Sequence, residues 1–257
     1  MRKLLKFIVR KVPRIYLIKF SYAFSWIFAA FYKGNKQHCP ICDGNFRTFL
    51  PYGYTDNNAE NRLCPSCLSL ERHRLIWLYL KNETKLFTEP MNMLHIAPEQ
   101  SFYKRFKAIK TLDYFTADLE SPLAEYHFDI HEIPFEDNKF DFIMCNHVLE
   151  HVDDEFKVTR ELYRVLKPGG FAILQVPINL DFNKTYEDKS ITTAKEREKH
   201  YGQYDHVRWH GLDYPERLEK SGFVVDSLGY IGKFTDEEVE KMRLPKSELL
   251  YIARKLK

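Results

Sequence analysis

Residues 140–177 restrict the possible folds of this 257-residue chain more than any other stretch. An apolar run at 140–145 is followed by a polar cluster and then by apolar residues at helical spacing. The Pro-Gly-Gly of 168–170 ends that helix, and a second apolar run follows at 171–177. This order predicts a strand, a polar edge, a helix, a turn and a second strand. Ligands of open α/β sheets bind beyond the carboxyl ends of the strands, so a functional site is expected at the polar cluster of Asn146, His147, Glu150 and His151.

Charge is unevenly distributed along the chain. Residues 1–36 hold nine of the 39 Lys and Arg side chains and none of the 36 Asp and Glu side chains, so residues 37–257 are acidic on balance. A mildly acidic body argues against a broad nucleic-acid-binding face. The hydrophobic share of 44% and the charged share of 29% are ordinary for a soluble globular protein.

The N-terminal segment, residues 1–36, is basic and apolar together. Between residues 15 and 32 the only charge is Lys19, and eight side chains are aromatic. A spanning helix needs about 20 apolar residues, so this run is slightly short, and a cleaved signal peptide would have a shorter apolar core. Basic and aromatic residues together favour a helix at an anionic membrane surface, bound through residues 1–32. Packing on the body or self-association is the alternative. We expect a cytoplasmic protein, peripheral at the inner membrane face.

Four cysteines form two pairs, Cys39 with Cys42 and Cys64 with Cys67, each with two intervening residues. This spacing lets one tight turn direct both sulfurs at one ion, and four thiolates complete a closed tetrahedral Zn²⁺ shell. We therefore predict a structural zinc ribbon in a unit of residues 37–90, in a reducing compartment. Four reduced core cysteines are the alternative. Cys145, the fifth cysteine, is expected to be a small buried residue.

A helix is predicted directly after the ribbon, with Ser69 as its cap and apolar residues spaced for one face. This helix joins the ribbon to the body of the protein. Arg72 and Arg74 are expected on its solvated face, and His73 is expected to be an ordinary packing histidine.

The body, residues 91–257, alternates between short apolar runs and helical patterns. Ser101 is expected to cap the helix that follows the first strand. Alternating strands and helices predict a Rossmann-like, doubly wound α/β fold with seven mostly parallel strands and helices on both faces. The predicted strands are residues 93–96, 112–117, 127–130, 140–145, 171–176, 223–228 and 249–253.

Two carboxylates follow predicted strands. Asp118 ends the second strand, some twenty residues after the loop that leaves the first strand. A carboxylate at that position can accept both hydroxyls of an adenosine ribose, as in dinucleotide-binding folds; a solvated loop Asp is the alternative. Asp129 and Ile130, at the end of the third strand, could hold an adenine edge through a carboxylate and a backbone amide.

Four segments resemble the class I S-adenosylmethionine-dependent methyltransferases: residues 117–122 (ADLESP), 129–141 (DIHEIPFEDNKFD), 146–152 (NHVLEHV) and 164–170 (RVLKPGG). The resemblance covers residues 91–257 and is closest to a small bacterial group in which a cysteine-paired ribbon precedes the catalytic domain. It implies S-adenosylmethionine as the cofactor. It also implies cofactor contacts at Asp118 for the ribose, at its neighbour Leu119, at Asp129 and Ile130 for the adenine, and at Asn146 and His147 near the methionine moiety or the acceptor.

The loop after the first strand departs from that family. A Gly-rich loop is usual there, but the segment is His95-Ile-Ala97-Pro-Glu99, and no glycine occurs between Gly53 and Gly169. Ala97 is small enough to permit close approach of a cofactor. Glu99 could pair with the cofactor's α-ammonium group, and His95 stands where an acid is common. The missing glycines also weigh against nicotinamide dinucleotides, whose pyrophosphate needs them.

Residues 179–221, which we call the insertion, lie where such folds commonly cover the acceptor. They contain a dense polar and aromatic cluster at 201–211. Methyl transfer needs alignment and proton removal, and a histidine is the natural base near neutral pH. His147, His151 and His206 are the candidates. His147 or His206 is favoured, because His151 has an alternative role at the strand–helix junction. Arg208 is expected to hold an anionic part of the acceptor.

Three functions are compatible with these residues. The favoured one is an O- or N-methyltransferase for a small-molecule, glycan or lipid-linked acceptor near a membrane. The second is a ribosomal- or transfer-RNA methyltransferase that grips RNA with the ribbon. The evidence against this second function is that residues 37–70 carry only Arg47 and Arg62 as fully charged basic side chains. Nucleic acid is therefore the less favoured partner. The third is a non-catalytic, zinc-stabilised interaction module with a degenerate cofactor loop.

Overall fold

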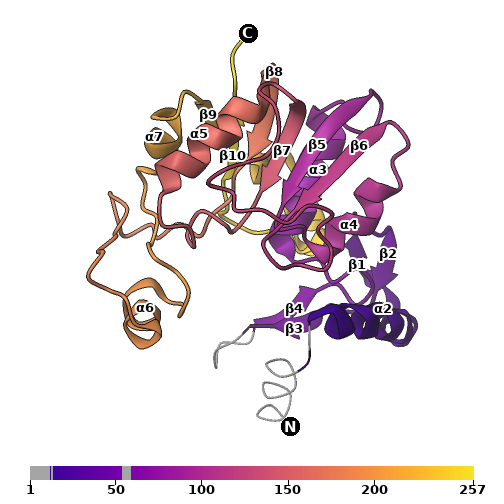
Figure 1. The fold of residues 1–257 in the computed structure, drawn as a ribbon. Helices are drawn as coiled ribbons and strands as arrows, with labels where there is room; N and C mark the ends of the chain where they lie inside the picture. Colours follow the sequence, from indigo (N-terminus) through magenta and orange to yellow (C-terminus); the bar gives the residue numbers. More distant parts are fainter. Residues whose placement is uncertain (1–11, 13, 54–58) are drawn as a thin grey trace.

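The computed structural model describes residues 12, 14–53 and 59–257 and shows an α/β body with a cysteine-bearing extension (Figure 1). The described part contains a central sheet of six strands in the order β6-β5-β7-β8-β10-β9. Strands β5 to β8 pair in parallel, and only β10 runs antiparallel to its neighbours β8 and β9. The bounds are β5 Met91–Ile96, β6 Leu112–Ala117, β7 Phe140–Cys145, β8 Leu166–Ile173, β9 Val224–Leu228 and β10 Leu250–Arg254. The Rossmann-like, mostly parallel arrangement predicted from the sequence is confirmed.

Helices cover both faces of this sheet (Figure 1). Successive residues of a strand point to opposite faces, so Met93 and Met144 join a core with α3 and α4, whereas Leu94 and Ile143 join a core with α5 and α7. The helices are α3 Glu71–Glu83, α4 Gln100–Lys107, α5 Glu155–Val165 and α7 Tyr214–Glu219. The insertion contains α6 Ala194–Tyr201, and the segment before β10 contains η1 Tyr230–Lys233 and α8 Asp236–Met242.

The prediction of seven strands is wrong for the described residues, because residues 127–130 form no strand. After β6 the chain turns back on the end of that strand instead. The backbone amides of Glu125 and Tyr126 both donate to the Thr116 carbonyl oxygen, at 3.0 and 2.9 Å. Only an isolated bridge between Ala117 and Tyr126 results. The predicted start of the next strand is also wrong: β8 begins at Leu166 and includes the Pro-Gly-Gly, because the chain becomes extended directly at the end of α5.

Two expected helix caps are absent from α3 and α4. Helix α3 begins after Leu70 and α4 after Glu99, and neither residue caps its helix through a side-chain hydrogen bond. Ser69 Oγ instead lies 3.3 Å from Cys39 Sγ, and Ser101 Oγ lies 3.2 Å from His73 Nδ1. Both serines therefore serve tertiary contacts, which short-range sequence patterns do not encode.

Arg74 was expected on a solvated face, and this is wrong: the side chain is fully buried. Its guanidinium donates to the carbonyl oxygens of Ser69 (2.8 Å), Met242 (2.7 Å) and Arg243 (2.8 Å). It also lies over the Phe49 ring, 4.6 Å from the centroid. Arg74 therefore ties the cysteine-bearing segment to the chain that leads into β10.

The cysteine-bearing segment consists of two small hairpins. Strand β1 Lys33–Cys39 pairs with β2 Gly44–Phe46, and β3 Leu50–Tyr52 pairs with β4 Ala59–Leu63. Cys39, Phe46 and Phe49 are buried in the same core as α3 and α4, and α8 packs against β1. The segment is therefore packed on the sheet's α3 face and does not stand apart from the body.

Helix α2 Arg14–Phe31 lies beside these hairpins (Figure 1). Its contacts include a hydrogen bond from Gln100 Nε2 to Ser21 Oγ and the Arg47 guanidinium over the Phe31 ring. Most of its large apolar side chains are exposed, including Phe20, Phe24, Trp26, Ile27 and Phe31. Among the helices that the structure describes, none combines the length and hydropathy that crossing a membrane requires.

Candidate functional site

The candidate site lies at the carboxyl ends of β5, β6 and β7. The chain passes from β5 to β6 on one side and then to β7 on the other, so the strand order reverses between β5 and β7. Ligands of open α/β sheets bind in the crevice at such a switch point. His95 and Glu99 follow β5, Asp118 follows β6, and Asn146 and His147 follow β7.

The loop after β5 retains a glycine-like conformation without a glycine. Ala97 has φ 50°, in the left-handed region that residues with a Cβ rarely adopt. Its amide donates to the Ala117 carbonyl oxygen at 2.8 Å, which holds the loop against the end of β6. The side chain at this position is a single methyl group, and approach of a cofactor to the loop stays a prediction.

Glu99 is the centre of a polar network at the switch point. The Glu99 carboxylate contacts the His95 ring through Oε2, and its Oε1 accepts from Asn146 Nδ2 at 3.0 Å. His95 Nδ1 in turn lies 2.7 Å from the Tyr114 hydroxyl. Burial alone would raise the pKa of Glu99, but the charge interaction and hydrogen bond with His95 and the bond from Asn146 lower it to about 2. Glu99 is therefore ionised at neutral pH.

Asp118 and Leu119 occupy an exposed turn directly after β6. Asp118 Oδ1 accepts from the backbone amides of Glu120 and Ser121, both at 2.8 Å. The second oxygen, Oδ2, has no hydrogen-bond partner among the described residues. One oxygen thus fixes the orientation of the carboxylate and leaves the other able to accept from a ligand. The Leu119 side chain is exposed.

Asp129 and Ile130 lie in the turn that replaces the third strand. Asp129 Oδ1 accepts from the backbone amide of His131 at 2.9 Å and from its ring Nδ1 at 2.6 Å. These two hydrogen bonds lower the pKa of Asp129. The Ile130 side chain is buried in the core beneath α5. The Asp129 carboxylate therefore stabilises the turn in which it lies. A ligand could reach only the side of the carboxylate that faces away from that turn.

His147 combines three features that bear on a role as a base. Its φ is 53°, so its backbone adopts the left-handed region, and its amide donates to the Gln175 carbonyl oxygen at 2.7 Å. Its Nδ1 donates to Glu150 Oε1 at 3.2 Å. Its Nε2 is buried and has no hydrogen-bond partner within the described chain. A neutral ring that donates from Nδ1 carries its lone pair on Nε2, so the ring is oriented as a base would be.

His151 and His206 lie together, although 54 residues separate them. Their ring centroids are 4.7 Å apart with the rings edge to face. His151 Nδ1 lies 3.2 Å from the Asp205 carbonyl oxygen. His206 is almost fully buried, and burial lowers its pKa. The structure thus brings three of the predicted histidines to one region, with Glu150 between His147 and His151.

Arg208 does not reach toward an acceptor, and the expected contact is replaced by a structural one. Its Nη1 donates to the carbonyl oxygens of Leu149 and Val152, both at 2.6 Å, and its Nε donates to Glu187 at 3.0 Å. The side chain is buried, because the insertion folds over the segment after β7. Arg208 therefore holds the chain around His147 and His151 in place.

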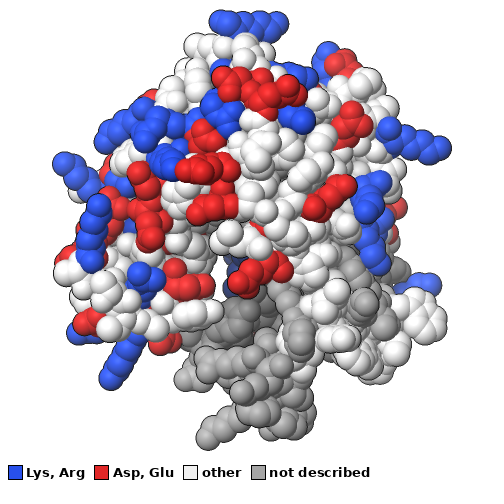
Figure 2. Space-filling model, in the orientation of Figure 1, with Lys and Arg blue, Asp and Glu red and all other residues white. Residues whose placement is uncertain are grey.

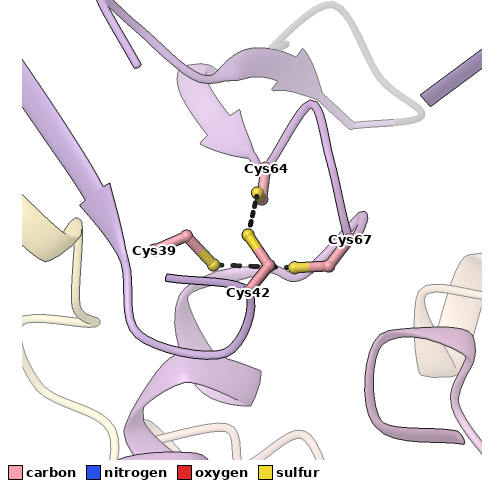
Figure 3. A group of neighbouring side chains, drawn as sticks. All are labelled: Cys39, Cys42, Cys64 and Cys67. Carbon is pink, nitrogen blue, oxygen red and sulfur yellow. Dashed lines mark hydrogen bonds between the residues drawn. The ribbon is translucent and has the colours of Figure 1, made fainter. Parts of the chain in front are cut away.

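The four paired cysteines converge on one point (Figure 3). Cys39 Sγ is 3.5 Å from Cys67 Sγ, and Cys42 Sγ is 3.7 Å from Cys64 Sγ. All five cysteines are free thiols. Zinc–sulfur bonds of about 2.3 Å in a tetrahedron place the sulfurs about 3.8 Å apart, so this donor set fits one zinc ion with little rearrangement.

A charged hollow of about 360 Å³ opens between α3 and the segment before β10. Its lining includes Arg72, Glu248 and Lys246. Glu248 interacts electrostatically with both Arg72 and His147, and burial raises its pKa. Sequence patterns did not point to Glu248, because no local motif marks it and it lies in the segment just before β10.

Residues 92–174 match the family described as a methyltransferase domain. The matched residues lie within the stretch in which the sequence resemblance was found. Demethylmenaquinone methyltransferase of Listeria welshimeri is 50% identical over 44 residues, which cover 17% of this chain and 19% of that protein. The Staphylococcus epidermidis protein of the same name is 40% identical over 58 residues, covering 23% and 24%. The chain thus spans about a fifth to a quarter of the length of these curated relatives.

A solved structure of the [4+2]-cyclase SpnF is similar to this chain at a TM-score of 0.50 and 13% identity, covering 84% of this chain and 90% of that one. At this identity the likeness concerns the fold alone. A fold of this kind can hold different chemistries, so function must be argued from the site.

Proposed function

We propose, from the match of residues 92–174 to a methyltransferase domain, that this protein transfers a methyl group from S-adenosylmethionine at the carboxyl edge of its sheet. The observation that carries the proposal is the loop after β5. It lacks glycine, but Ala97 gives it the left-handed backbone of a glycine loop at the switch point. Asp118 ends the neighbouring strand with one carboxylate oxygen unused by the described chain.

The chemistry of these residues fits the cofactor. Asp118 Oδ2 would accept from the ribose hydroxyls, and the outward face of Asp129 with the Ile130 amide would meet the adenine. The ionised Glu99 would pair with the α-ammonium group, while His95 and Asn146 hold its carboxylate in place. S-adenosylmethionine supplies an electrophilic methyl group on a positively charged sulfur.

His147 would remove the acceptor proton. The acceptor oxygen or nitrogen forms a bond to the methyl carbon, the carbon–sulfur bond breaks, and its electron pair stays on sulfur. The acceptor's proton passes to His147 Nε2, and Glu150 at Nδ1 stabilises the imidazolium that results. S-adenosylhomocysteine and the methylated acceptor are the products. The His151 and His206 rings contact each other, and His151 also contacts a backbone carbonyl, so His147 is the better-placed base.

A small-molecule acceptor is favoured over RNA. The curated relatives are named for a small molecule, demethylmenaquinone. On the face shown in Figure 2, basic and acidic side chains are interspersed, and neither sign forms a continuous field of the kind that binds a phosphate backbone. Glycan and lipid-linked acceptors belong to the same proposal, since both can present a hydroxyl group to His147.

Calorimetric titration with S-adenosylmethionine and S-adenosylhomocysteine tests the cofactor. We expect both to bind, and Asp118→Ala to weaken binding at least about tenfold, because a charged hydrogen bond is lost. Asp113→Ala is the matched control: Asp113 is an exposed aspartate on the same strand, and its loss should leave affinity unchanged. Failure of the wild-type protein to bind either compound would favour the non-catalytic interaction module.

Transfer of a labelled methyl group to cell-extract fractions tests the acceptor. Label should appear in the small-molecule fraction and fall about 100-fold or more in His147→Ala. Label in the RNA fraction would instead support the RNA alternative. Label that persists in full in His147→Ala would remove His147 as the base.

Cys39, Cys42, Cys64 and Cys67 would hold a structural zinc ion, because four thiolates leave no position for water. Metal analysis of the purified protein should show the ion, and Cys64→Ser should release it and unfold the hairpins. Cys145→Ser is the matched control, since Cys145 lies apart in the core beneath α5. Full zinc content in Cys64→Ser would contradict the assignment.

Helix α2 would lie on an anionic membrane surface through its exposed aromatic side chains, which include Phe20, Phe24 and Trp26. The full chain should then sediment with vesicles that contain anionic lipid, and less with neutral vesicles. Trp26→Ser with Phe20→Ser should reduce this binding. Equal binding by the deletion of residues 1–32 would refute it, and dimerisation lost with the same substitutions would indicate self-association. The predicted location of the protein at the inner membrane face depends on the outcome of this vesicle experiment.

A further inference from the structure

We infer that Glu150, His151 and His206 bind a divalent transition-metal ion beside His147. One carboxylate oxygen and two ring nitrogens from these residues lie within 4.8 Å of one another. Metal–ligand distances of about 2.1 Å place such atoms roughly 3 to 3.5 Å apart. A contraction of at most about 1.3 to 1.8 Å, within the range of side-chain rotation, therefore completes the site.

Glu150 lacks the partner that its burial requires. Its side chain is 2% exposed, and Oε2 has no hydrogen-bond partner in the described part of the chain. His147 contacts the other oxygen, Oε1. An ionised carboxylate away from water is costly unless each oxygen is compensated. A cation at Oε2, next to two imidazoles, supplies the compensation that the described residues do not.

The two histidine rings are held in ways that suit metal ligands. His151 Nδ1 lies 3.2 Å from the Asp205 carbonyl oxygen, and the buried His206 ring packs edge to face against the His151 ring, with the centroids 4.7 Å apart. A ring that donates to a carbonyl from one nitrogen leaves the other unprotonated and free to bind a metal. Metal-bound histidines in proteins are typically oriented in this way.

The two segments that carry the ligands are fixed to each other. The Val207 amide donates to the Glu150 carbonyl oxygen at 2.9 Å. Arg208 donates to the carbonyl oxygens of Leu149 and Val152 on either side of the Glu150–His151 pair. His206 is therefore held near Glu150 and His151 by main-chain contacts, and the site needs no large closure to form.

The donor set indicates the kind of ion. Two imidazoles and one carboxylate suit manganese, iron, cobalt, nickel or zinc better than magnesium or calcium, which prefer oxygen ligands. Three protein ligands also leave coordination positions open, unlike the four thiolates of the ribbon. An acceptor hydroxyl bound there would lose its proton to His147 more readily. This last consequence rests on the proposed methyl transfer, whereas metal binding does not.

The test titrates Mn²⁺, and separately Zn²⁺, into the full chain with its cysteine ribbon already loaded, without S-adenosylmethionine. Calorimetry and the electron paramagnetic resonance signal of free Mn²⁺ report binding. We expect one additional ion per chain, bound at least about tenfold more weakly in His206→Ala, His151→Ala and Glu150→Gln. His200→Ala is the matched control: its ring contacts Tyr186 in the same insertion, and metal binding should not change.

The site is overturned if neither ion binds the loaded wild-type protein, or if the three ligand variants bind as the wild type does. His151 is partly exposed, so His151→Ala keeps the test valid should His206→Ala fail to fold. Metal binding without binding of S-adenosylmethionine would refute the proposed function and leave the metal site standing. Binding of S-adenosylmethionine without binding of a metal ion would refute the metal site and leave the proposed function standing.

Discussion

The cysteine ribbon (residues 37–70) and the insertion are both anchored to the body by buried arginines, but the arginines are satisfied in opposite ways. Arg74 donates only to neutral acceptors, chiefly the carbonyl oxygens of Ser69, Met242 and Arg243. Arg217 and Arg208 meet Glu155, which His210 also contacts at 3.0 Å. Burial accordingly lowers the pKa of Arg74. Burial also acts to lower that of Arg217, but the bonds and charge of Glu155 outweigh it and raise the pKa.

This difference determines how the anchoring of each region depends on pH. Carbonyl acceptors do not titrate, so the contact at Arg74 holds at any pH at which the protein is folded. A carboxylate can be protonated, so the contact at Glu155 weakens in acid. The hydrogen bonds of Arg74 thus do not titrate, although Glu71 and the paired cysteines interact with its charge. The anchor over the candidate acceptor site consists of ion pairs with carboxylates and is the more sensitive to acid.

Removal of the Arg74 charge should have the largest effect. Arg74→Met leaves several buried carbonyl oxygens without a donor, and we expect the free energy of unfolding to fall by about 4 kcal/mol. Denaturant unfolding followed by circular dichroism measures it. Arg105→Met on the exposed side of α4 is the matched control and should change stability by less than about 0.5 kcal/mol. Equal effects of the two substitutions would show that the carbonyl contacts contribute nothing.

Removal of the Glu155 charge comes next. Glu155→Gln leaves Arg217 and Arg208 without their central carboxylate, although Glu187 still contacts both. We expect a loss of about 3 kcal/mol in the same unfolding experiment. Glu89→Gln removes an exposed pair with Lys85 and should cost no more than about 0.5 kcal/mol. A Glu155→Gln protein as stable as the wild type would mean that the ion pairs only offset their own desolvation.

The pH dependence sharpens the comparison. Glu155 has its pKa lowered from 4.5 to about 2: burial opposes the shift, and His210 and Arg217 cause it. A lowered carboxyl pKa stabilises the fold above about pH 4.5, and this stabilisation is lost as the pH falls toward 2. Between pH 7 and pH 3 we expect about 2 kcal/mol to be lost through this group. The groups around it are Arg208, Arg217, His210 and Glu187.

Comparison of two variants isolates that contribution. The difference in stability between wild type and Glu155→Gln should shrink as the pH falls, and it should shrink more than the difference between wild type and Arg74→Met, whose hydrogen-bond acceptors do not titrate. Unfolding curves at pH 7, 5 and 3 measure both differences. A constant difference for Glu155→Gln would place the acid sensitivity elsewhere.

Much of the fold followed from sequence patterns that act over short range. The apolar runs of β5, β6 and β7 and the paired cysteines were found because each is encoded within a few residues. Residues 127–130 were predicted to form a strand, but the backbone amides of Glu125 and Tyr126, directly before them, both donate to Thr116 and turn the chain back on β6. Local periodicity cannot show which acceptor a backbone amide will reach.

The candidate site was only partly predictable for a related reason. His147 and Asn146 follow a strand, so their placement at the edge was expected. The proximity of His206 to Glu150 depends on how the insertion folds back, and Arg208, read as a ligand for the acceptor, supplies the hydrogen bonds that fold it. Arg74 was misread likewise, because a charged side chain in a helix is usually solvated and nothing nearby signals the distant carbonyl oxygens of Met242 and Arg243.

Ala97 offers the smallest effect and the most direct test of the loop after β5. Ala97→Gly relieves the cost of a Cβ at φ 50° but adds freedom to the unfolded chain, so we expect a net gain of about 0.5 kcal/mol. Ala108→Gly is the matched control, because Ala108 has φ −85° and should lose about 0.5 to 1 kcal/mol. Opposite signs in paired thermal unfolding would establish that the loop keeps a glycine conformation without glycine. A loss at both positions would mean that the Ala97 side chain stabilises the loop by packing, and the resemblance of this loop to a cofactor-binding glycine loop would then be one of position alone.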